Sequence, residues 1–215
     1  MHNYLIRVHL PDRPGALGAV ASRIGSVGGD VISIEILQRS KGVVVDELGV
    51  SLAGGGLIDL MRDEILEVDG VAIESLRPVE GELPDRHAEL LDVVTDLFGQ
   101  PSPAALLDRL TERVRVSLAA DFAAVLDAER FQLVTGEGDL PGRERLAALG
   151  RQALGPYPDP PRPDDGLTTA HMVHAHLVLV VGRPDPVLRD RERQWVSIMA
   201  DIADHGWPDL EPGSR

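Results

Sequence analysis

The fold of the first part of the chain is decided by the stretch Tyr4-Leu5-Ile6-Arg7-Val8-His9-Leu10-Pro11-Asp12-Arg13-Pro14-Gly15-Ala16-Leu17. Residues 4–10 place apolar side chains at every second position, which is the period of a half-buried β-strand. Residues 11–15 contain two prolines and a glycine, so they end the strand in a turn. An amphipathic helix is predicted next, because apolar residues recur at helical spacing at Leu17, Val20, Ala21, Ile24 and Val27.

The following residues extend this pattern to the order β-α-β-β-α-β. Gly28-Gly29 ends the helix, residues 32–36 alternate like a strand, and residues 39–42 form a turn into a second β-rich run at 43–52. A second helix with Leu57, Met61 and Ile65 on one face precedes a last strand at 71–76. We therefore predict an α+β fold whose first part is a ferredoxin-like sandwich, with four antiparallel strands and both helices on one face. Its open strand edges favour a homodimer.

The first 79 residues resemble the ACT family of regulatory amino-acid-binding domains. The resemblance rests on the strand, on the motif at residues 12–17, and on Gly28-Gly29-Asp30-Val31-Ile32 after the helix. In that family the ligand lies between the loop after the first strand and the start of the second strand of a neighbouring copy, although many copies only mediate pairing. The resemblance implies ligand-binding residues at Asp12, Arg13, Pro14, Gly15, Ala16 and Leu17 of one protomer and at Asp30, Val31 and Ile32 of its partner.

The chemistry of residues 12–17 independently favours a zwitterionic ligand. The unpaired N–H groups at a helix start can hold a carboxylate, and a glycine at position 15 lets a ligand approach the backbone closely. Asp12 could accept a hydrogen bond from an ammonium group. The alternative is that Asp12 only caps the helix and Pro14 only begins it.

Aspartates stand at positions 12 and 30, where family members that bind amino acids often carry amide side chains. Two acidic groups would repel the carboxylate of a ligand. The sequence therefore leaves two possibilities open: a preference for a ligand with a cationic side chain, or a degenerate site.

A second unit follows a polar linker at residues 80–87, so we predict domains at 1–79 and 88–206 and a tail at 207–215. Apolar spacing predicts a helix around residues 90–97 and another around 106–114. The further elements predicted are strands at 121–126 and 131–134, a helix at 143–154, strands at 167–172 and 175–181, and a last helix with Trp195, Ile198, Met199 and Ile202 on one face.

The end of this second unit resembles a GAF-type sensor domain, in which a buried strand leads through a turn into a terminal amphipathic helix. The turn here is the Pro-Asp-Pro sequence at 184–186. Chromophore-carrying GAF domains need a cysteine, and cyclic-nucleotide-binding ones carry a lysine-containing signature, whereas this chain has no cysteine and no lysine after Lys41. We therefore expect a small GAF-like α/β domain that is unliganded or serves for pairing.

The composition narrows the possible partners. The chain has 215 residues, of which 35 are acidic and 21 are basic, for a formal charge of −14. Such a field repels phosphate backbones and anionic headgroups, so we expect no nucleic-acid and no membrane partner. The absence of cysteine excludes a disulfide framework and cysteine-ligated metals. With neither a leader-like start nor a long apolar run, the sequence predicts a cytoplasmic protein.

Signals for catalysis are weak. Dinucleotide, P-loop and nucleophile-elbow motifs are missing from the sequence. His171, His174 and His176 could place two imidazoles on one metal, but a hairpin turn near Val173 with solvent-facing histidines explains the same pattern. The acid pairs at 46–47 and 63–64 are interpreted as solvated surface.

We therefore predict a regulatory protein without catalytic residues, metal or cofactor. It would sense a small ligand, most simply an amino acid, at the interface of an ACT homodimer and respond allosterically. The alternative is a ligand-free scaffold that pairs with a partner protein.

Overall fold

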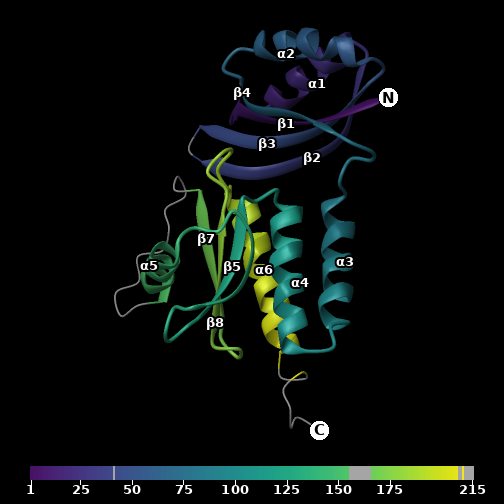
Figure 1. Cartoon of the computed structure of the whole chain (residues 1–215). Helices are drawn as coiled ribbons and strands as arrows, with labels where there is room; N and C mark the ends of the chain where they lie inside the picture. Colours follow the sequence, from purple (N-terminus) through teal and green to yellow (C-terminus); the bar gives the residue numbers. More distant parts are fainter. Residues whose placement is uncertain (41, 155–165, 208–209, 211–215) are drawn as a thin grey trace. The chain divides into compact units, whose positions relative to one another are not determined.

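The computed structural model describes residues 1–40, 42–154, 166–207 and 210, and the chain divides into two compact units, Met1–Pro84 and Asp85–Arg215 (Figure 1). The tail predicted at 207–215 lies almost wholly outside the described residues. Each unit contains one antiparallel sheet of four strands, so the chain has a mixed α+β architecture. Among the described residues, no helix is long and apolar enough to cross a membrane.

The first unit has the predicted β-α-β-β-α-β order. Its elements are β1 (His2–Pro11), α1 (Ala16–Ser26), β2 (Gly29–Ser40), β3 (Val43–Leu52), the 3₁₀ turn η1 (Gly55–Leu57), α2 (Ile58–Leu66) and β4 (Ala72–Val79). The sheet order is β2-β3-β1-β4, so β3 and β1 are central and β2 and β4 form the edges. This topology is consistent with the ferredoxin-like sandwich expected from the sequence.

Helices α1 and α2 cover one face of this sheet (Figure 1). Val20 and Ile24 of α1 and Met61 and Ile65 of α2 are fully buried, and they pack against alternate side chains of β1 and β3. Apolar side chains four residues apart on the helices and two residues apart on the strands thus pack into one core. Gly29 permits this packing after α1, because a Cβ atom there would lie only 2.8 Å from the Ile24 side chain.

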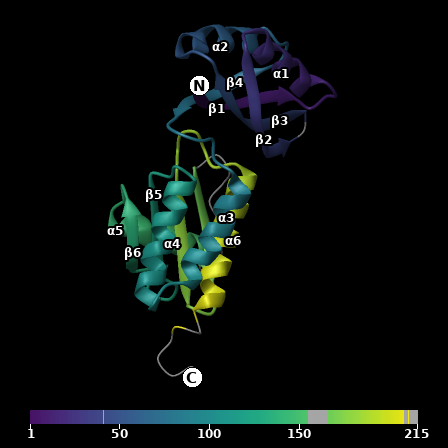
Figure 2. The ribbon, with the colours of Figure 1, turned by 90° about the vertical axis from the view of Figure 1, so that its right-hand side faces the viewer.

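The second unit contains a sheet in the order β6-β5-β8-β7. Its elements are α3 (Arg86–Phe98), α4 (Pro103–Ser117), β5 (Phe122–Asp127), β6 (Leu133–Gly138), α5 (Arg143–Leu154), β7 (Leu167–Met172), β8 (Leu177–Gly182) and α6 (Asp190–Gly206). Helices α3, α4 and α6 lie on one face of the sheet, as Figure 2 shows, and α5 packs against the other. The central strand predicted at 175–181 is confirmed, since every residue of β8 is buried.

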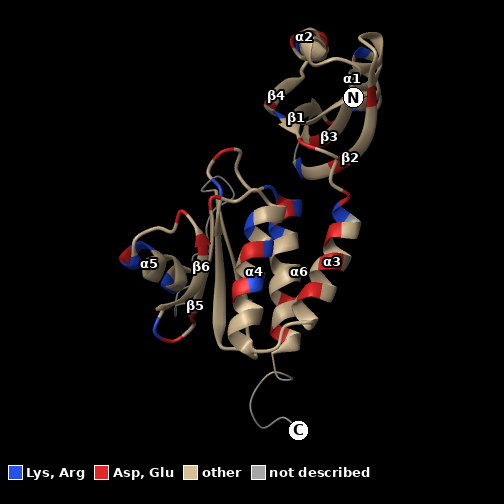
Figure 3. Cartoon of the chain, turned by 45° about the vertical axis from the view of Figure 1, so that its right-hand side comes forward, with Lys and Arg blue, Asp and Glu red and all other residues tan. Residues whose placement is uncertain are grey.

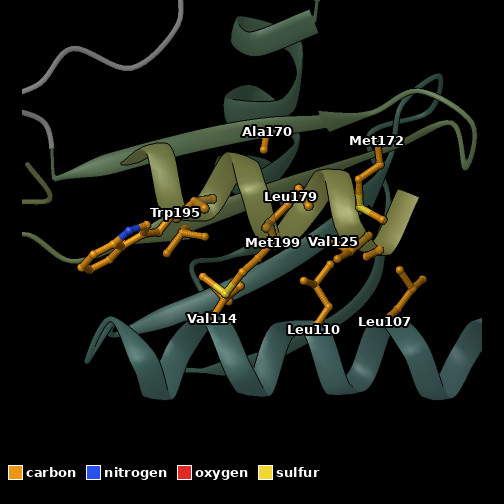
Figure 4. Close-up of a cluster of buried hydrophobic side chains, with 14 of the residues drawn as sticks. Leu107, Leu110, Val114, Val125, Ala170, Met172, Leu179, Trp195 and Met199 are labelled. Atoms are coloured by element: carbon orange, nitrogen blue, oxygen red, sulfur yellow. The ribbon is translucent and has the colours of Figure 1, made fainter. Parts of the chain in front are cut away.

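The two sheet faces of the second unit carry separate cores. On one face, Leu110 and Val114 of α4 and Met199 of α6 meet strand residues such as Val125 (Figure 4). Trp195 is 4% exposed in this core, as its helical spacing predicts. On the other face, α5 contributes Leu146 and Leu149 to a smaller cluster, whose strand residues are Phe122, Ala124, Leu126, Val178 and Val180.

Several predicted boundaries differ from the structure; the strand predicted at 32–36, for example, runs from Gly29 to Ser40. The strand predicted from residue 131 begins at Leu133, because Phe131 belongs to the preceding turn and has φ of 54°. The strand predicted from residue 175 begins at Leu177, since residues 173–176 form the turn. The last strand of the first unit runs to Val79 rather than ending at residue 76.

Candidate functional site

The turn between β1 and α1 contains most of the predicted ligand-binding residues. The N–H of Asp12 donates to the carbonyl of Gly42 at 3.0 Å, which fixes the start of the turn beside the β2–β3 hairpin. Gly15 precedes the helix with φ of 87°, a left-handed conformation, and no side chain caps the helix. The alternative in which Asp12 caps the helix and Pro14 begins it is therefore wrong, because α1 begins at Ala16.

The N-terminus of α1 has two backbone donors without an acceptor in the described part of the chain. Among the described residues, the N–H groups of Leu17 and Gly18 have no hydrogen-bond partner, whereas those of Ala16 and Ala19 donate to the turn. The first turn of α1 contains no acidic side chain, and a Cβ atom built at Gly15 would meet nothing within 4 Å. Two backbone donors at the start of the helix thus lack an acceptor among the described residues, and such N–H groups can bind a carboxylate.

Arg39, near the end of β2, adds a positive charge to this turn. Its Nε lies 3.8 Å from Oδ1 of Asp12, and both side chains are partly exposed. A contact of this kind contributes little to stability. The contact nevertheless places a guanidinium group beside a carboxylate. These two groups complement the carboxylate and the ammonium group of an amino acid. Arg39 was missed in the sequence because only the pairing of β2 with β3 brings it to residue 12.

Asp46, on β3, is a second group that the sequence did not reveal. Its residue is 2% exposed, and its Oδ1 atom has no hydrogen-bond partner in the described part of the chain. It lies opposite Val8 of β1 and Ile36 of β2, on the sheet face that carries the helices. Burial raises the pKa of Asp46 above its ordinary value, and the positive charge of Arg39 opposes part of that effect. Asp46 therefore feels the same guanidinium group that contacts Asp12.

The interpretation of residues 46–47 as solvated surface is wrong. Glu47 is 6% exposed and accepts a hydrogen bond from Arg7 at 3.0 Å. The two acids do point to opposite faces, as their adjacency in a strand requires, but β3 is a central strand whose residues are nearly all buried. The pair at 63–64 lies on helix α2, where Asp63 is largely exposed.

Asp30, Val31 and Ile32 lie at the other end of the sheet. Asp30 pairs with Ser51 of β3, whereas Pro11, next to the turn, pairs with Val43. At about 3.4 Å per residue, these two positions on β3 are roughly 27 Å apart. One chain therefore does not bring the two predicted halves of the ligand site together. Val31 is half-buried against the core, and Ile32 is 56% exposed.

One member of the histidine cluster, His174, has a structural role. Asp204 of α6 is 4% exposed and accepts hydrogen bonds from the backbone N–H groups of His174 and Ala175, at 3.1 and 2.9 Å. The Nδ1 atom of His174 also lies 2.8 Å from Asp204. The turn between β7 and β8 is thus tied to the last helix. Within the described ranges, no three His, Cys, Asp or Glu side chains are grouped to hold a metal ion.

Comparisons with known proteins gave the following findings. No protein-family model matches the chain, and no curated protein matches it. Among solved structures, an ACT domain protein from Streptococcus pneumoniae is 18% identical, with a TM-score of 0.31, over 36% of this chain and 89% of its own. The ACT domain of a GTP pyrophosphokinase from Chlorobium tepidum is 15% identical, with a TM-score of 0.30, over 37% of this chain and 100% of its own. An unknown protein from Galdieria sulphuraria is 13% identical, with a TM-score of 0.34, over 95% of this chain and 92% of its own.

The buried carboxylate of Asp46 predicts that Asp46→Asn stabilises the free protein. Because the pKa of Asp46 is raised in the folded chain, wild type loses stability as the pH rises from the ordinary value of 3.8 through the folded-state pKa. An amide of the same shape carries no charge, so we expect the free energy of unfolding at pH 7 to increase by about 1 kcal/mol. Urea unfolding between pH 3 and 8 measures the difference, which should shrink toward low pH. The control Asp63→Asn, on the exposed face of α2, should change little, and a destabilised Asp46→Asn would contradict this account.

The tether at Asp204 predicts that Asp204→Ala destabilises the second unit by about 2–3 kcal/mol, since several donors lose one buried acceptor. Burial alone would raise the pKa of Asp204, but the N–H groups of Ala175 and His174 and the His174 ring outweigh it and lower the pKa. The stabilisation is therefore present above the ordinary value of 3.8 and is lost as the pH falls through the folded-state pKa. Chemical denaturation checks this, with Asp201→Ala on the exposed face of α6 as the matched control. Equal effects of the two substitutions would exclude the tether.

Proposed function

We propose that this chain is an ACT-like regulatory protein that senses an amino acid and catalyses no reaction. The observation that carries the proposal is the turn at the start of α1, where Asp12, in contact with Arg39 of β2, precedes the N–H groups of Leu17 and Gly18, which have no partner among the described residues. Donors and an acceptor in one exposed turn suit a ligand that carries a carboxylate and an ammonium group. The second unit, a GAF-like domain in this proposal, would receive the signal.

The ligand would replace the contact between Arg39 and Asp12 with its own contacts to these two side chains. Its carboxylate would accept hydrogen bonds from the N–H groups at the helix start and from Arg39, and its ammonium group would donate to Asp12. Because the Arg39–Asp12 contact is 3.8 Å long and partly exposed, separating the two side chains costs little. A zwitterion can therefore replace a weak internal contact with two charge-assisted contacts.

The balance of charge favours amino acids with a cationic side chain. Asp12 and Asp46 both lie within the influence of Arg39, so acids outnumber the base even in one protomer. Asp30 of a second copy would add another acid. A second positive charge on the ligand would offset this excess, and a positive charge close to Asp46 would relieve the cost of its burial.

A second copy of the chain would complete the site through β2. This strand lies at the edge of the sheet and exposes Ile32, Ile34 and Ile36 at 56%, 48% and 50%. An edge strand with apolar side chains favours pairing with another chain. If two β2 strands pair antiparallel about a twofold axis at Ile34, Asp30 of one copy lies opposite Gln38 of the other. Asp30 then stands next to Arg39 and the turn that contains Asp12.

The ligand would act by favouring this paired arrangement. A ligand shifts an equilibrium between two states only by its difference in affinity for them. In a single chain, the two halves of the proposed site lie at opposite ends of the sheet. The ligand would therefore bind the dimer more tightly than the monomer, because only the dimer contains the complete site. Amino-acid binding would thereby be coupled to dimer stability.

A ligand-free pairing scaffold is the second candidate. It is favoured by the contact between Arg39 and Asp12, which gives both side chains a partner without a ligand. The two candidates share the dimer and differ only in whether a small molecule binds at the turn. Ligand binding by the dimer therefore separates them.

The sensing proposal predicts that an amino acid raises the melting temperature. In a thermal-shift panel of the proteinogenic amino acids at millimolar concentration, we expect the largest increase with lysine or arginine, because their side chains offset the excess of acids. A ligand at 100 times its dissociation constant adds about 2.7 kcal/mol of stability. Arg39→Gln and Asp46→Asn should each abolish the shift, whereas Arg62→Gln, on the exposed face of α2, should keep it. No shift with any amino acid would leave the scaffold as the function.

The pairing surface predicts that Ile34→Lys disrupts a homodimer. A charge at the centre of the proposed strand pair would face its own copy across the twofold axis, and we expect the dimer to dissociate at least tenfold more readily. Sedimentation over a range of concentrations measures this. Leu60→Lys is the matched control, since Leu60 is also 50% exposed but lies on α2. A wild-type chain that remains monomeric at high concentration would refute the shared site.

A further inference from the structure

The second unit contains a cavity that the proposed amino-acid site does not use. Its volume is about 740 Å³, and it lies between the turn after β5 and helix α5. The charged groups that line it include Arg130 from the turn and Arg143 and Arg151 from α5. Figure 3 shows basic residues in blue on this turn and on α5. A volume of this size is in the range of small-molecule sites.

Internal contacts of the three cavity arginines are few among the described residues: the backbone N–H of Arg130 and, to a lesser degree, its charge lower the pKa of the neighbouring Asp127, but the two side chains form no ion pair. Within the described part of the chain, the guanidinium groups of Arg130, Arg143 and Arg151 form no ion pair and donate no hydrogen bond. Other arginines of the second unit are paired, such as Arg109 with Asp96 at 2.7 Å. In a chain with 35 acidic and 21 basic residues, most arginines are expected to find a carboxylate. Three arginines around a single cavity, none of them in an ion pair within the described residues, favour an external anion.

The apolar wall of the cavity is built by close packing. Phe131 has φ of 54°, a conformation that bulky residues rarely adopt, so the surrounding structure must hold it in place. Gly150 of α5 makes room for it, because a Cβ atom there would lie 2.7 Å from the Phe131 ring. Leu133 lines the cavity as well and is 40% exposed, so it continues this wall. The cavity thus joins a fixed apolar surface to a set of positive charges.

We propose that this cavity binds a small organic anion, a molecule with a carboxylate or phosphate group and an apolar body. Among the described lining residues, three guanidinium groups and the carboxylate of Glu144 leave a net charge of +2. A guanidinium group matches the geometry of both carboxylate and phosphate. The apolar body would pack on Phe131 and Leu133, which distinguishes this ligand from an inorganic ion.

The site is independent of the proposed amino-acid site. Its lining residues all belong to the second unit, and its excess of positive charge is opposite to the excess of acids near Asp12 and Asp46. The positive charges of this cavity do not attract a zwitterionic amino acid as a whole, and they repel a cationic one. Failure of one proposal therefore leaves the other intact.

Calorimetric titration of the full chain tests the proposal with four probes: 1-naphthoate, 1-naphthyl phosphate, 1-naphthalenemethanol and inorganic phosphate. We expect at least one of the two organic anions to bind with a dissociation constant below about 1 mM. The neutral alcohol and inorganic phosphate should bind at least tenfold more weakly, because each lacks one half of the recognised chemistry. The stronger of the two organic anions identifies the preferred group.

Substitutions locate the binding. Arg143→Gln and Arg151→Gln should each weaken binding about tenfold or more, since each removes a charge-assisted contact. Arg145→Gln is the matched control, because Arg145 lies on the same helix, has no ion pair in the described structure and does not line the cavity. It should change the affinity by less than about twofold. Circular dichroism of each variant verifies folding.

Three results would overturn the proposal. The first is that neither organic anion binds at up to about 10 mM. The second is that inorganic phosphate binds as tightly as the organic anions, which would remove the role of the apolar wall. The third is that Arg145→Gln weakens binding as much as Arg143→Gln and Arg151→Gln, which would indicate general attraction to a basic helix.

Discussion

The antiparallel pairing of β3 with β1 and β2 is the constraint on which the first unit depends. It places Pro11 and the turn after it at one end of the sheet and Asp30 at the other. The two halves of the predicted ligand site, at Asp12 and at Asp30, are therefore far apart within one chain. The same pairing brings Arg39 to Asp12 and buries Asp46. Any ligand that needs both Asp12 and Asp30 must therefore lie between two chains.

Asp46 connects this geometry to stability. A carboxylate that is buried, with one oxygen unpartnered, weakens the folded state, and the raised pKa of Asp46 expresses that cost. An apolar residue at this position of a central strand would pack well. This cost is consistent with the proposed amino-acid site, because binding sites commonly retain groups that the fold alone would not favour.

Local periodicity made much of the fold predictable. Alternation over residues 4–10, the glycines at 28–29 and the apolar run at 177–181 each act within a few residues, and the corresponding elements are confirmed. Arg39 and Asp46 could not be identified in this way, because their roles arise from pairing between strands. The strand predicted from residue 131 began too early, since the left-handed conformation of Phe131 depends on packing against Gly150. The arginines of the cavity are likewise brought together only when the β5–β6 turn packs near α5.

The two proposed sites have opposite charge requirements. Around Asp12 the acids exceed the bases, whereas the cavity beside α5 has an excess of arginine. The chain as a whole carries −14, so an anion approaching the second unit meets a repulsive long-range field and must be held by short-range contacts. Guanidinium groups next to an apolar wall would supply such contacts. A cationic amino acid and an organic anion would therefore not compete for one site, and a protein with both could respond to two classes of metabolite at once.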